Sequence, residues 1–382
     1  MTPFVWLVAL AVLGLLASAF DLGLGLRKLG RLAAEAPWQR AQAPLVSLIV
    51  AARDEERGIE AAMRSLLAQD YSAFEVVAVD DRSRDQTGAI LDRLAAADPR
   101  LRVVHVRELP AGWLGKNHAL AVAARAARGE WLLFTDGDVV MAPTTLARAI
   151  ALVERRGLDH LALLPDIHTP GLLLEAFVTG FSVVGLLALR PWAAEHPKRR
   201  ATGIGAFNLV RAAAYARVAG HEPIRLRPDD DIKLGKLLKQ SGARQAVLLG
   251  RELVSVEWYP SLASAIDGLM KNSFAVVEYR SAVALGAALF YLVFALGPLA
   301  LLFLGNGIAR GLGGLALATQ LAMHLYVARV ARQPLRAALL FPLADLLLGW
   351  IVLRAMLLTL ARRGIVWRDT FYPLAELRKN RI

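Results

Sequence analysis

Apolar residues are concentrated at the two ends of the chain. Residues 4–26 form an almost uninterrupted apolar run in which Asp21 is the only charge, and basic residues follow it from Arg27 onward. At about 1.5 Å per helical residue, this run is long enough to cross the ~30 Å apolar core of a bilayer. A cleaved signal peptide is the competing interpretation, but no basic residue precedes the run. The pattern therefore predicts an N-terminal transmembrane anchor in residues 1–30.

Three more apolar stretches lie near the other end of the chain. They predict about three transmembrane helices within a C-terminal membrane domain and basic tail, residues 279–382. Asp345 and Arg354 lie inside the last stretch, where ionisable groups usually face protein or water, so they form either a structural pair or a functional site. The three stretches cover residues 282–304, 312–330 and 337–360.

The basic residues leave a conflict over membrane topology. The flank that begins at Arg27 predicts that residues 27–281 lie in the cytoplasm. Three further crossings would put the C-terminus on the opposite side, yet the tail is crowded with basic residues, which predicts that it lies inside. Either one C-terminal segment does not cross completely or the charge rule fails in this chain. The tail residues concerned are Arg362, Arg363, Arg368, Arg378, Lys379 and Arg381.

Residues 45–165 alternate between short apolar runs and helical patterns. After the first run, Ile59, Met63 and Leu66 share one helical face, and after the fourth, Pro143 suits the first turn of a helix. Strands that alternate with helices form parallel sheets with right-handed crossovers. The sequence therefore predicts an α/β domain with a mainly parallel, Rossmann-like sheet. The four predicted strands are residues 45–52, 74–79, 101–106 and 131–135.

Acidic residues follow three of these strands, at residues 53–55, 80–81 and 136–138. One acidic strand end is usually a helix cap or a solvated turn. Three of them converge on one edge of a parallel sheet, where ligands bind, and they would repel one another without a cation. Asp136 and Asp138 are separated by one glycine and are the predicted ligands of Mg²⁺ or Mn²⁺.

Two further segments carry candidate chemistry. Residues 112–117 (GWLGKN) place Lys116 between flexible glycines and a helix, which suits an anionic group; an ordinary loop with a solvated lysine is the alternative. Residues 228–235 contain three adjacent aspartates at a helix start, which either complement the helix dipole or include a general base.

A fifth apolar stretch, residues 171–189, lies between the Asp136–Asp138 pair and the three aspartates. It has three interpretations: a crossing, a buried core helix or an interfacial helix. A complete crossing would put Asp138 and Asp231 on opposite sides of the membrane. We therefore predict an interfacial helix at residues 171–190, within a catalytic domain that covers residues 40–278.

Composition narrows the class of protein. The 382 residues include no cysteine, which excludes thiol catalysis, cysteine-ligated zinc and disulfides. Hydrophobic residues make up 56%, charged residues 20%, and mean hydropathy is +0.44, which is atypical of a soluble enzyme. The net charge is +12, and the basic residues flank the apolar segments, whereas the candidate site is acidic. This distribution favours a lipid bilayer as partner and no nucleic acid.

Together these motifs resemble glycosyltransferase family 2, which has the GT-A fold, over about residues 45–275. Residues 77–88 (VAVDDRSRDQTG) look like the family's V-D-D-x-S-x-D-x-T segment. Residues 136–138 match its D-x-D, and residues 230–235 are similar to its E-D-x-x-L-G, with Asp230 in place of glutamate.

A closer likeness is to membrane-bound lipid glycosyltransferases, namely hopanoid-associated and carotenoid-modifying bacterial enzymes, with ceramide glucosyltransferases more distant. One departure is the absence of a Q/R-x-x-R-W element after the base. That absence speaks against a processive synthase and leaves open which group replaces the element. The matching residues are 112–116, 201–207, Gly220 with His221, Lys271 with Asn272, and Trp367 with Arg368 and Tyr372.

The resemblance implies roles for individual residues. Asp231 takes the place of the catalytic base, with Asp230 beside it. Asp136 and Asp138 would hold Mg²⁺ or Mn²⁺. The acceptor side would include Gly205, His221 and Lys271. The residues expected to bind the nucleotide sugar are Ala51, Arg53, Glu55, Asp80, Lys116, Asp136 and Gly137.

The predicted function is that of a membrane-bound, metal-dependent inverting glycosyltransferase. It would move a sugar from a nucleotide sugar, with a UDP-sugar favoured, to a lipid hydroxyl such as that of a hopanoid, carotenoid or ceramide. The alternatives are a polyprenyl-phosphate glycosyltransferase, a catalytically inactive lipid-binding relative and a nucleotidyltransferase. The expected location is a bacterial-type inner (cytoplasmic) membrane, crossed several times, with the catalytic domain facing the cytoplasm.

Overall fold

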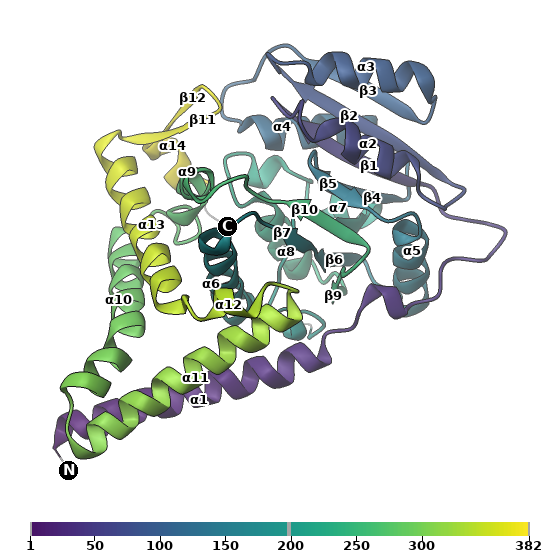
Figure 1. Ribbon diagram of the computed structural model, residues 1–382. Coiled ribbons are helices and arrows are strands. Elements are labelled where there is room, and N and C mark those ends of the chain that lie inside the picture. Colours follow the sequence, from purple (N-terminus) through teal and green to yellow (C-terminus); the bar gives the residue numbers. More distant parts are fainter. Residues whose placement is uncertain (1, 197–199, 381–382) are drawn as a thin grey trace. The chain divides into compact units, whose positions relative to one another are not determined.

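The computed structural model describes residues 2–196 and 200–380, so Arg381 of the basic tail lies outside the described residues. The chain divides into two compact units, each built from separate stretches of sequence (Figure 1). Unit 1 comprises Met1–Lys28, Thr169–Arg190 and Tyr259–Arg378. Unit 2 comprises Leu29–His168, Pro191–Trp258 and Lys379–Ile382.

Unit 2 is built on a seven-stranded sheet with the order β3-β2-β1-β4-β8-β6-β9 within the described residues. Strand β8 runs antiparallel to both of its neighbours, and the other pairs are parallel. The predicted mainly parallel α/β fold is confirmed. The strands are β1 (Val46–Ala52), β2 (Phe74–Asp81), β3 (Leu101–Val106), β4 (Trp131–Asp136), β6 (His160–Leu164), β8 (Asn208–Arg211) and β9 (Gln245–Leu249).

Helices cover both faces of this sheet, which is why its central strands are apolar on both faces. Leu48 and Val50 of β1 point into one core, against α2 and α5. Ile49 points into the other, against α4 and α8. The helical elements are η1 (Leu32–Ala34), α2 (Ile59–Leu67), α3 (Thr87–Ala97), α4 (Gly115–Ala126), α5 (Thr145–Arg156), η2 (Pro191–Ala193), α7 (Ala212–Arg217), η3 (Glu222–Ile224) and α8 (Asp230–Gln240).

A smaller sheet adjoins the carboxyl end of β4. Its order is β5-β10-β7, with β10 antiparallel to β5 and parallel to β7. Because β5 begins directly after Asp138, this sheet fixes the backbone on the far side of the D-x-D motif. Its strands are β5 (Val139–Met141), β7 (Asp166–His168) and β10 (Val254–Glu257).

The register of the large sheet brings the acidic strand ends together. Ala51 of β1 lies opposite Val79 of β2 on one side and Asp136 of β4 on the other. The next residue, Ala52, lies opposite Asp80. The carboxyl ends of three neighbouring parallel strands therefore form one edge, as the sequence predicted.

Within its described residues, unit 1 contains five helices that are long and apolar enough to cross a membrane. Four of them correspond to the apolar helices predicted at the two ends of the chain, and the fifth is the predicted helix at residues 171–190. The boundaries drawn between domains in the sequence stay predictions. The elements of unit 1 are α1 (Pro3–Lys28), α6 (Leu172–Leu189), α9 (Leu262–Ser273), α10 (Ser281–Leu304), α11 (Gly307–Val330), α12 (Leu335–Ala338), α13 (Phe341–Ala361), β11 (Gly364–Trp367), β12 (Thr370–Pro373) and α14 (Leu374–Lys379).

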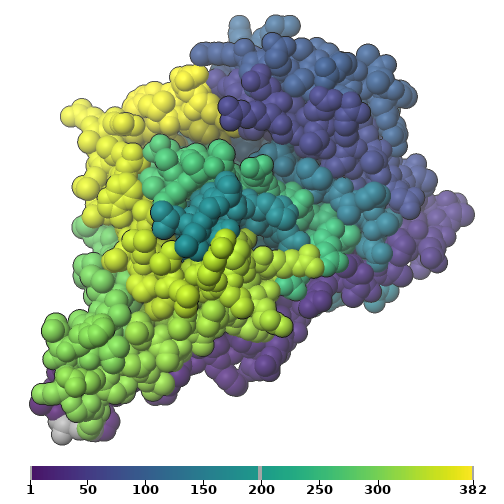
Figure 2. Space-filling view, viewed as in Figure 1, coloured from purple at the N-terminus to yellow at the C-terminus, as the bar shows by residue number. Residues whose placement is uncertain are grey.

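Small residues let the helices of unit 1 pack closely. A Cβ atom at Gly349 of α13 would lie 2.8 Å from Tyr291 Cβ of α10, and one at Gly313 of α11 would lie 2.6 Å from Leu301 Cβ. In lipid, such close approach drives helix association, because apolar side chains gain little by leaving lipid tails. The turn between α10 and α11 forms the tip of this unit, beside the beginning of α1 (Figure 2).

Candidate active site

Lys116 lies at the centre of the acidic edge in unit 2. It is the second residue of α4, and its Nζ is 2.8 Å from Asp136 Oδ1 and 3.6 Å from Asp230 Oδ1. Burial alone would lower the pKa of Lys116, but the carboxylates of Asp136, Asp230 and Asp231 raise it well above its usual value. The lysine therefore stays charged and joins three motifs that are far apart in the sequence.

The three adjacent aspartates at the start of α8 have three different partners. Asp229 pairs with the fully buried Arg227 through two contacts of 2.9 Å. Asp230 faces Lys116. Asp231 Oδ2 accepts a 2.8 Å hydrogen bond from the backbone N–H of Gly205. Only the last two carboxylates therefore face the candidate site.

The environment of Asp231 favours protonation of its carboxylate. Its side chain is half-buried, and its Oδ1 accepts a 2.8 Å hydrogen bond from the N–H of Ile232. Burial, followed by repulsion from Asp230, raises its pKa to about 7, although Lys116 opposes the shift. A carboxylate with this pKa takes up a proton near neutral pH, where an ordinary aspartate does not.

Two glycines allow the segment at residues 201–205 to lie against the start of α8. A Cβ atom at Gly203 would lie 2.1 Å from the carbonyl oxygen of Asp231, and one at Gly235 would lie 2.5 Å from the carbonyl carbon of Thr202. A Cβ atom at Gly205 would lie 2.7 Å from Asp136 Oδ2. The predicted acceptor-side residue Gly205 thus lies between the D-x-D motif and Asp231.

Asp136 and Asp138 flank the turn between β4 and β5. The pKa of Asp138 rises to about 7, first because the group is buried and then because Asp136 and Glu55 repel its negative charge. Gly137 between them has only ordinary contacts, with Ile59 Cδ1 at 3.4 Å and the carbonyl oxygen of Ala51 at 3.7 Å from an added Cβ. The motif therefore collects more negative charge than its surroundings neutralise.

This donor set fits a hard divalent cation. Among the described residues, no group of three or more His, Cys, Asp or Glu side chains could hold a metal ion by itself. Mg²⁺ and Mn²⁺, however, are commonly held by one or two carboxylates together with the phosphates of a substrate. Asp136 and Asp138 supply such a pair.

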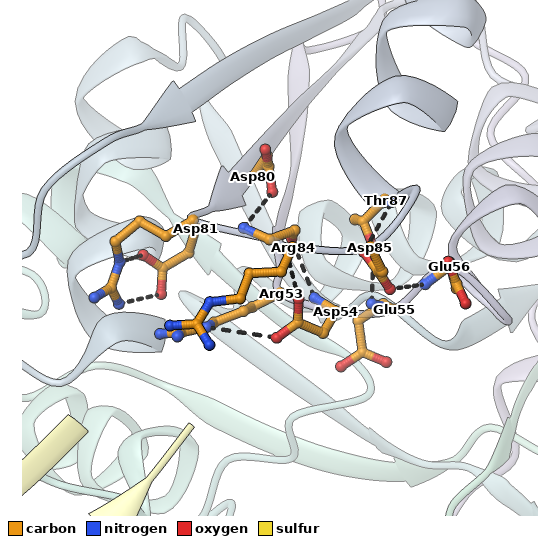
Figure 3. Close-up of polar contacts among 11 residues, drawn as sticks. Arg53, Asp54, Glu55, Glu56, Asp80, Asp81, Arg84, Asp85 and Thr87 are labelled. Atoms are coloured by element: carbon orange, nitrogen blue, oxygen red, sulfur yellow. Dashed lines mark hydrogen bonds and ion pairs between the residues drawn. The ribbon is translucent and has the colours of Figure 1, made fainter. Parts of the chain in front are cut away.

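The loops after β1 and β2 interlock at the other end of the site (Figure 3). The N–H of Glu55 donates to Thr87 Oγ1 at 2.8 Å, and the N–H of Glu56 donates to Asp85 Oδ2 at 3.0 Å. In the reverse direction, the N–H of Arg84 donates to Asp54 Oδ1 at 2.8 Å. These reciprocal bonds hold the two loops in one conformation and fix the positions of Arg53 and Glu55.

Arg53 and Asp80 are both buried at this end. Arg53 Nε is 3.7 Å from Asp54 Oδ2. Asp80 Oδ1 accepts from the N–H of Ser83 at 3.2 Å, and its Oδ2 is 2.9 Å from His105 Nδ1. A carboxylate has about four lone-pair positions, so Asp80 retains capacity to accept from a ligand.

His105 is a site residue that the sequence analysis missed. Its Nδ1 contacts Asp80 and its Nε2 contacts Asp92, each at 2.9 Å. These hydrogen bonds, Asp80 first, raise the pKa of His105. The feature that identifies His105 is the sheet register, which puts His105 opposite Asp80. The sequence alone does not state that register.

Asn117 and Arg227 were also missed, and both position the site. Asn117 Nδ2 donates to the carbonyl oxygens of Ile224 and Arg227 at 2.7 and 2.9 Å. This ties the first turn of α4, which carries Lys116, to the loop before the three aspartates. An asparagine beside a lysine gave no sequence signal for this role.

The remaining two predicted acceptor-side residues have structural partners. His221 is buried, its Nδ1 lies 2.7 Å from the Tyr215 hydroxyl, and burial lowers its pKa to about 3. Lys271 belongs to α9 of unit 1, where its Nζ lies 4.1 Å above the ring of Trp367. A role for either residue in binding an acceptor stays a prediction.

The fold is an α/β domain whose sheet edge carries carboxylates from three strand ends and one central lysine. Residues 47–200 match the family model described as glycosyl transferase family 2. Over these residues the chain is similar to that family.

Relatives agree with this assignment. The chain is 34% identical over 116 residues to the uncharacterized glycosyltransferase EpsJ of Bacillus subtilis, a match covering 30% of this chain and 32% of that protein. It is 24% identical over 234 residues to 4,4'-diaponeurosporenoate glycosyltransferase of Staphylococcus haemolyticus, covering 59% and 60%. It is 33% identical over 114 residues to beta-monoglucosyldiacylglycerol synthase of Trichormus variabilis, covering 29% and 24%. The matched part thus spans between about a quarter and three fifths of these relatives' lengths.

A solved structure shares the fold. The mannosyltransferase PcManGT of Pyrobaculum calidifontis, solved in complex with GDP-Man and Mn²⁺, aligns with a TM-score of 0.57 at 20% sequence identity. The alignment covers 93% of this chain and 97% of that one.

The close approach at Gly203 generates a stability prediction. Gly203→Ala would drive a Cβ atom into the carbonyl of Asp231, so we expect the free energy of unfolding to fall by about 1–3 kcal/mol. Gly30→Ala is the matched control in unit 2, because its Cβ would meet only the Leu248 side chain, at 3.4 Å. Thermal unfolding of the detergent-solubilised variants measures both. Equal melting temperatures for the two would contradict the prediction.

Proposed function

We propose that this protein is a membrane-bound inverting glycosyltransferase that moves a sugar from a nucleotide sugar to the hydroxyl group of a lipid. The observation that carries the proposal is the position of Lys116, which joins Asp136 of the D-x-D motif to Asp230 beside the candidate base. The family match of residues 47–200 supports sugar transfer from a nucleotide sugar as the type of reaction.

The nucleotide is proposed to bind between the interlocked loops and the end of β2. Asp80 would accept a hydrogen bond from the base, and uracil N3–H is a suitable donor, so a UDP-sugar is favoured. Ala51, Arg53 and Glu55 would line the nucleoside pocket. The order that the loop–loop hydrogen bonds impose reduces the conformational cost of binding.

The diphosphate is proposed to lie at the D-x-D motif. Asp136 and Asp138 would hold Mg²⁺ or Mn²⁺. The Mn²⁺ in the PcManGT complex supports this proposal. Such a cation stabilises the negative charge that develops on the departing diphosphate. Lys116 would add a second positive charge near the same oxygens.

Asp231 is proposed to act as the base. It would take the proton of the lipid hydroxyl while the hydroxyl oxygen bonds to the anomeric carbon and the bond from that carbon to the diphosphate breaks. One such displacement inverts the configuration at the anomeric carbon. The Gly205 N–H holds one oxygen of Asp231, and Lys116 keeps Asp230 away from the proton-accepting role.

A lipid acceptor is supported by two observations. In the part of unit 1 that the structure describes, five helices are long and apolar enough to cross a membrane. The names of two relatives, a diaponeurosporenoate glycosyltransferase and a monoglucosyldiacylglycerol synthase, refer to apolar acceptors. We propose a bacterial-type cytoplasmic membrane, with unit 2 facing the cytoplasm.

The direct test uses purified protein, a total lipid extract and a panel of labelled nucleotide sugars with Mg²⁺ or Mn²⁺. We expect one sugar to appear on a neutral lipid with inverted anomeric configuration, together with release of nucleoside diphosphate. Product only on polyprenyl phosphate would replace the acceptor assignment. Release of pyrophosphate would indicate nucleotidyl transfer, and no turnover with any donor would indicate an inactive relative.

The base assignment predicts the effect of Asp231→Asn. We expect the rate of transfer to fall by about 10²–10⁴-fold, because proton removal from the hydroxyl is lost, while the donor still binds. Steady-state kinetics and donor binding by calorimetry measure the two effects. The control is Glu222→Gln, an exposed carboxylate outside the site, which should leave both unchanged. Near-normal turnover of Asp231→Asn would refute this role.

The raised pKa of Asp138 predicts a pH dependence of cation binding. Below a pKa of about 7 the carboxyl is protonated and competes with the cation, so Mn²⁺ should bind less tightly as pH falls. At pH 6 about one molecule in ten carries the Asp138 carboxylate, so the affinity should fall by about tenfold relative to pH 8. Calorimetric titration of the native chain measures it. Asp138→Asn should bind weakly at both pH values, and a pH-independent native affinity would contradict the assignment.

A further inference from the structure

The described C-terminal residues rejoin unit 2. Asn380 Oδ1 accepts a 3.0 Å hydrogen bond from the N–H of Leu226, and its Nδ2 donates to the carbonyl oxygen of Pro223 at 2.7 Å. All three residues belong to unit 2. The stretch from Tyr259 to Arg378 therefore begins and ends at the same unit.

This return constrains the path through a bilayer. A segment that leaves a water-facing unit and comes back to it crosses the membrane an even number of times. The stretch contains three long apolar helices, α10, α11 and α13, so at most two of them cross. The chain likewise enters α6 from His168 and leaves it at Pro191, both in unit 2, so α6 makes no single complete crossing.

We propose that α1, α10 and α11 span the bilayer, and that α6 and α13 do not cross it but lie within one leaflet, where they form a lipid-binding surface. Helices α10 and α11 are separated only by Gly305 and Asn306, so they form an antiparallel hairpin. Helix α11 contacts α1 and runs alongside it in the same direction (Figure 1). The end of α11 therefore returns to the side on which α1 ends.

The buried share of residues differs between the helices proposed to span the bilayer and those proposed to lie within one leaflet. In the most apolar window of α1 and of α10, 11% of residues are buried, as expected of helices that face lipid. The corresponding share is 44% in both α6 and α13, which pack against each other. Helix α11 is intermediate at 39%, because it lies between α1 and α10.

Ion pairs hold both ends of α6 near one level of the membrane. At its C-terminal end, Arg190 lies 2.6 Å from Asp21, which precedes the end of α1 by seven residues or ~10 Å of helix. At its N-terminal end, Glu175 lies 3.8 Å from Arg336, which follows the end of α11. Because α1 and α11 end on the same side, α6 lies roughly in the plane of the leaflet.

Helix α13 is held in a similar way. Near its start, the buried Asp345 lies 3.8 Å from His324, in the last two turns of α11, a contact that becomes an ion pair when His324 is protonated. In its second half, Arg354 lies 3.3 Å from Asp267 of α9, which follows unit 2 directly in the chain. Each of these contacts joins α13 to another helix of unit 1.

The distribution of basic residues agrees with this path and removes the conflict found in the sequence. Among the described residues, only Arg310 would lie on the far side, close to the α10–α11 turn. The basic residues after α1, after α11 and after α13 would all lie on the side of unit 2, as the positive-inside rule requires. A crossing by α13 would instead place Arg362 and Arg363 on the far side.

The β11–β12 hairpin extends the surface into the headgroup layer. Val366 and Phe371 are 56% and 50% exposed and lie opposite each other in its register. Arg362, Arg363 and Arg368 flank them. Exposed apolar side chains bordered by arginines fit a leaflet that contains anionic lipids.

The absence of cysteine makes the native chain a background without reactive thiols, so single cysteines report sidedness directly. The variants are Ser72→Cys in unit 2, Asn306→Cys in the α10–α11 turn, Arg332→Cys after α11, and Ala375→Cys in α14. Each is labelled with a membrane-impermeant maleimide in right-side-out and inside-out vesicles. Ser72→Cys defines the side of unit 2, and all four positions are exposed.

We expect Arg332→Cys and Ala375→Cys to label in the same vesicles as Ser72→Cys, and Asn306→Cys only in the others. If Ala375→Cys labels with Asn306→Cys, α13 crosses and the proposal is overturned. If Arg332→Cys labels with Asn306→Cys, α11 does not cross. If Asn306→Cys labels with Ser72→Cys, the hairpin does not span. Labelling requires no turnover, so these outcomes are independent of the proposed glycosyltransferase activity.

The flanks of α6 are tested in the same vesicles. Pro170→Cys and Glu195→Cys are exposed positions on either side of it and should both label with Ser72→Cys. Labelling of the two on opposite sides would show that α6 spans the bilayer. A full set of expected results would place six positions on the path proposed here.

Discussion

The acidic edge of unit 2 depends on one positive charge. Asp136, Asp230 and Asp231 come from different motifs, and each would raise the pKa of the others if they met without compensation. Lys116 lies within 2.8 Å of Asp136 and 3.6 Å of Asp230, and it allows these carboxylates to share one edge of the sheet. Its own position is fixed by Asn117, which ties the first turn of α4 to the loop before α8. Burial first, and repulsion between the carboxylates second, still raise the pKa values of Asp138 and Asp231 to about 7. These two carboxyl groups therefore take up a proton near neutral pH.

The register of the parallel strands and the close contacts at glycines bring the separate sequence motifs together at this edge. The register sets Ala51 beside Asp136 and Ala52 beside Asp80, so the loops after β1, β2 and β4 must meet. Gly203 and Gly235 then let the segment before β8 lie against α8 without a Cβ atom between them. Glycine is therefore required at both positions for the same steric reason, since a side chain on Gly203 or Gly235 would push Asp231 away from Gly205.

The sequence was sufficient for the strands and their acidic ends, because buried parallel strands are apolar runs and the residues after them mark one edge. It also located Lys116, Asp136, Asp138 and Asp231 without showing that they meet. It was insufficient where a role depends on pairing across the sheet or on a buried loop. His105 acquires its partners only through the β2–β3 register, and Arg227 is recognisable only once it is buried against Asp229. The family resemblance placed His221 on the acceptor side, but it did not predict that the ring would be buried and in contact with the Tyr215 hydroxyl.

Hydropathy identifies the apolar helices of the chain, but it does not determine which of them cross a membrane. Five helices of the described chain are long and apolar enough to cross, yet the return of Asn380 to unit 2 permits only an even number of crossings between Tyr259 and Arg378. Charge supplies the missing information, because Asp21, Glu175 and Arg354 each have an ion-pair partner within unit 1. Charged groups in lipid require partners or water, so paired charges mark the depth at which a helix leaves the apolar layer. Under that constraint the basic C-terminal tail, the N-terminal anchor and the chain's excess positive charge are all accounted for by one arrangement, in which two apolar helices rest in the leaflet and three cross it.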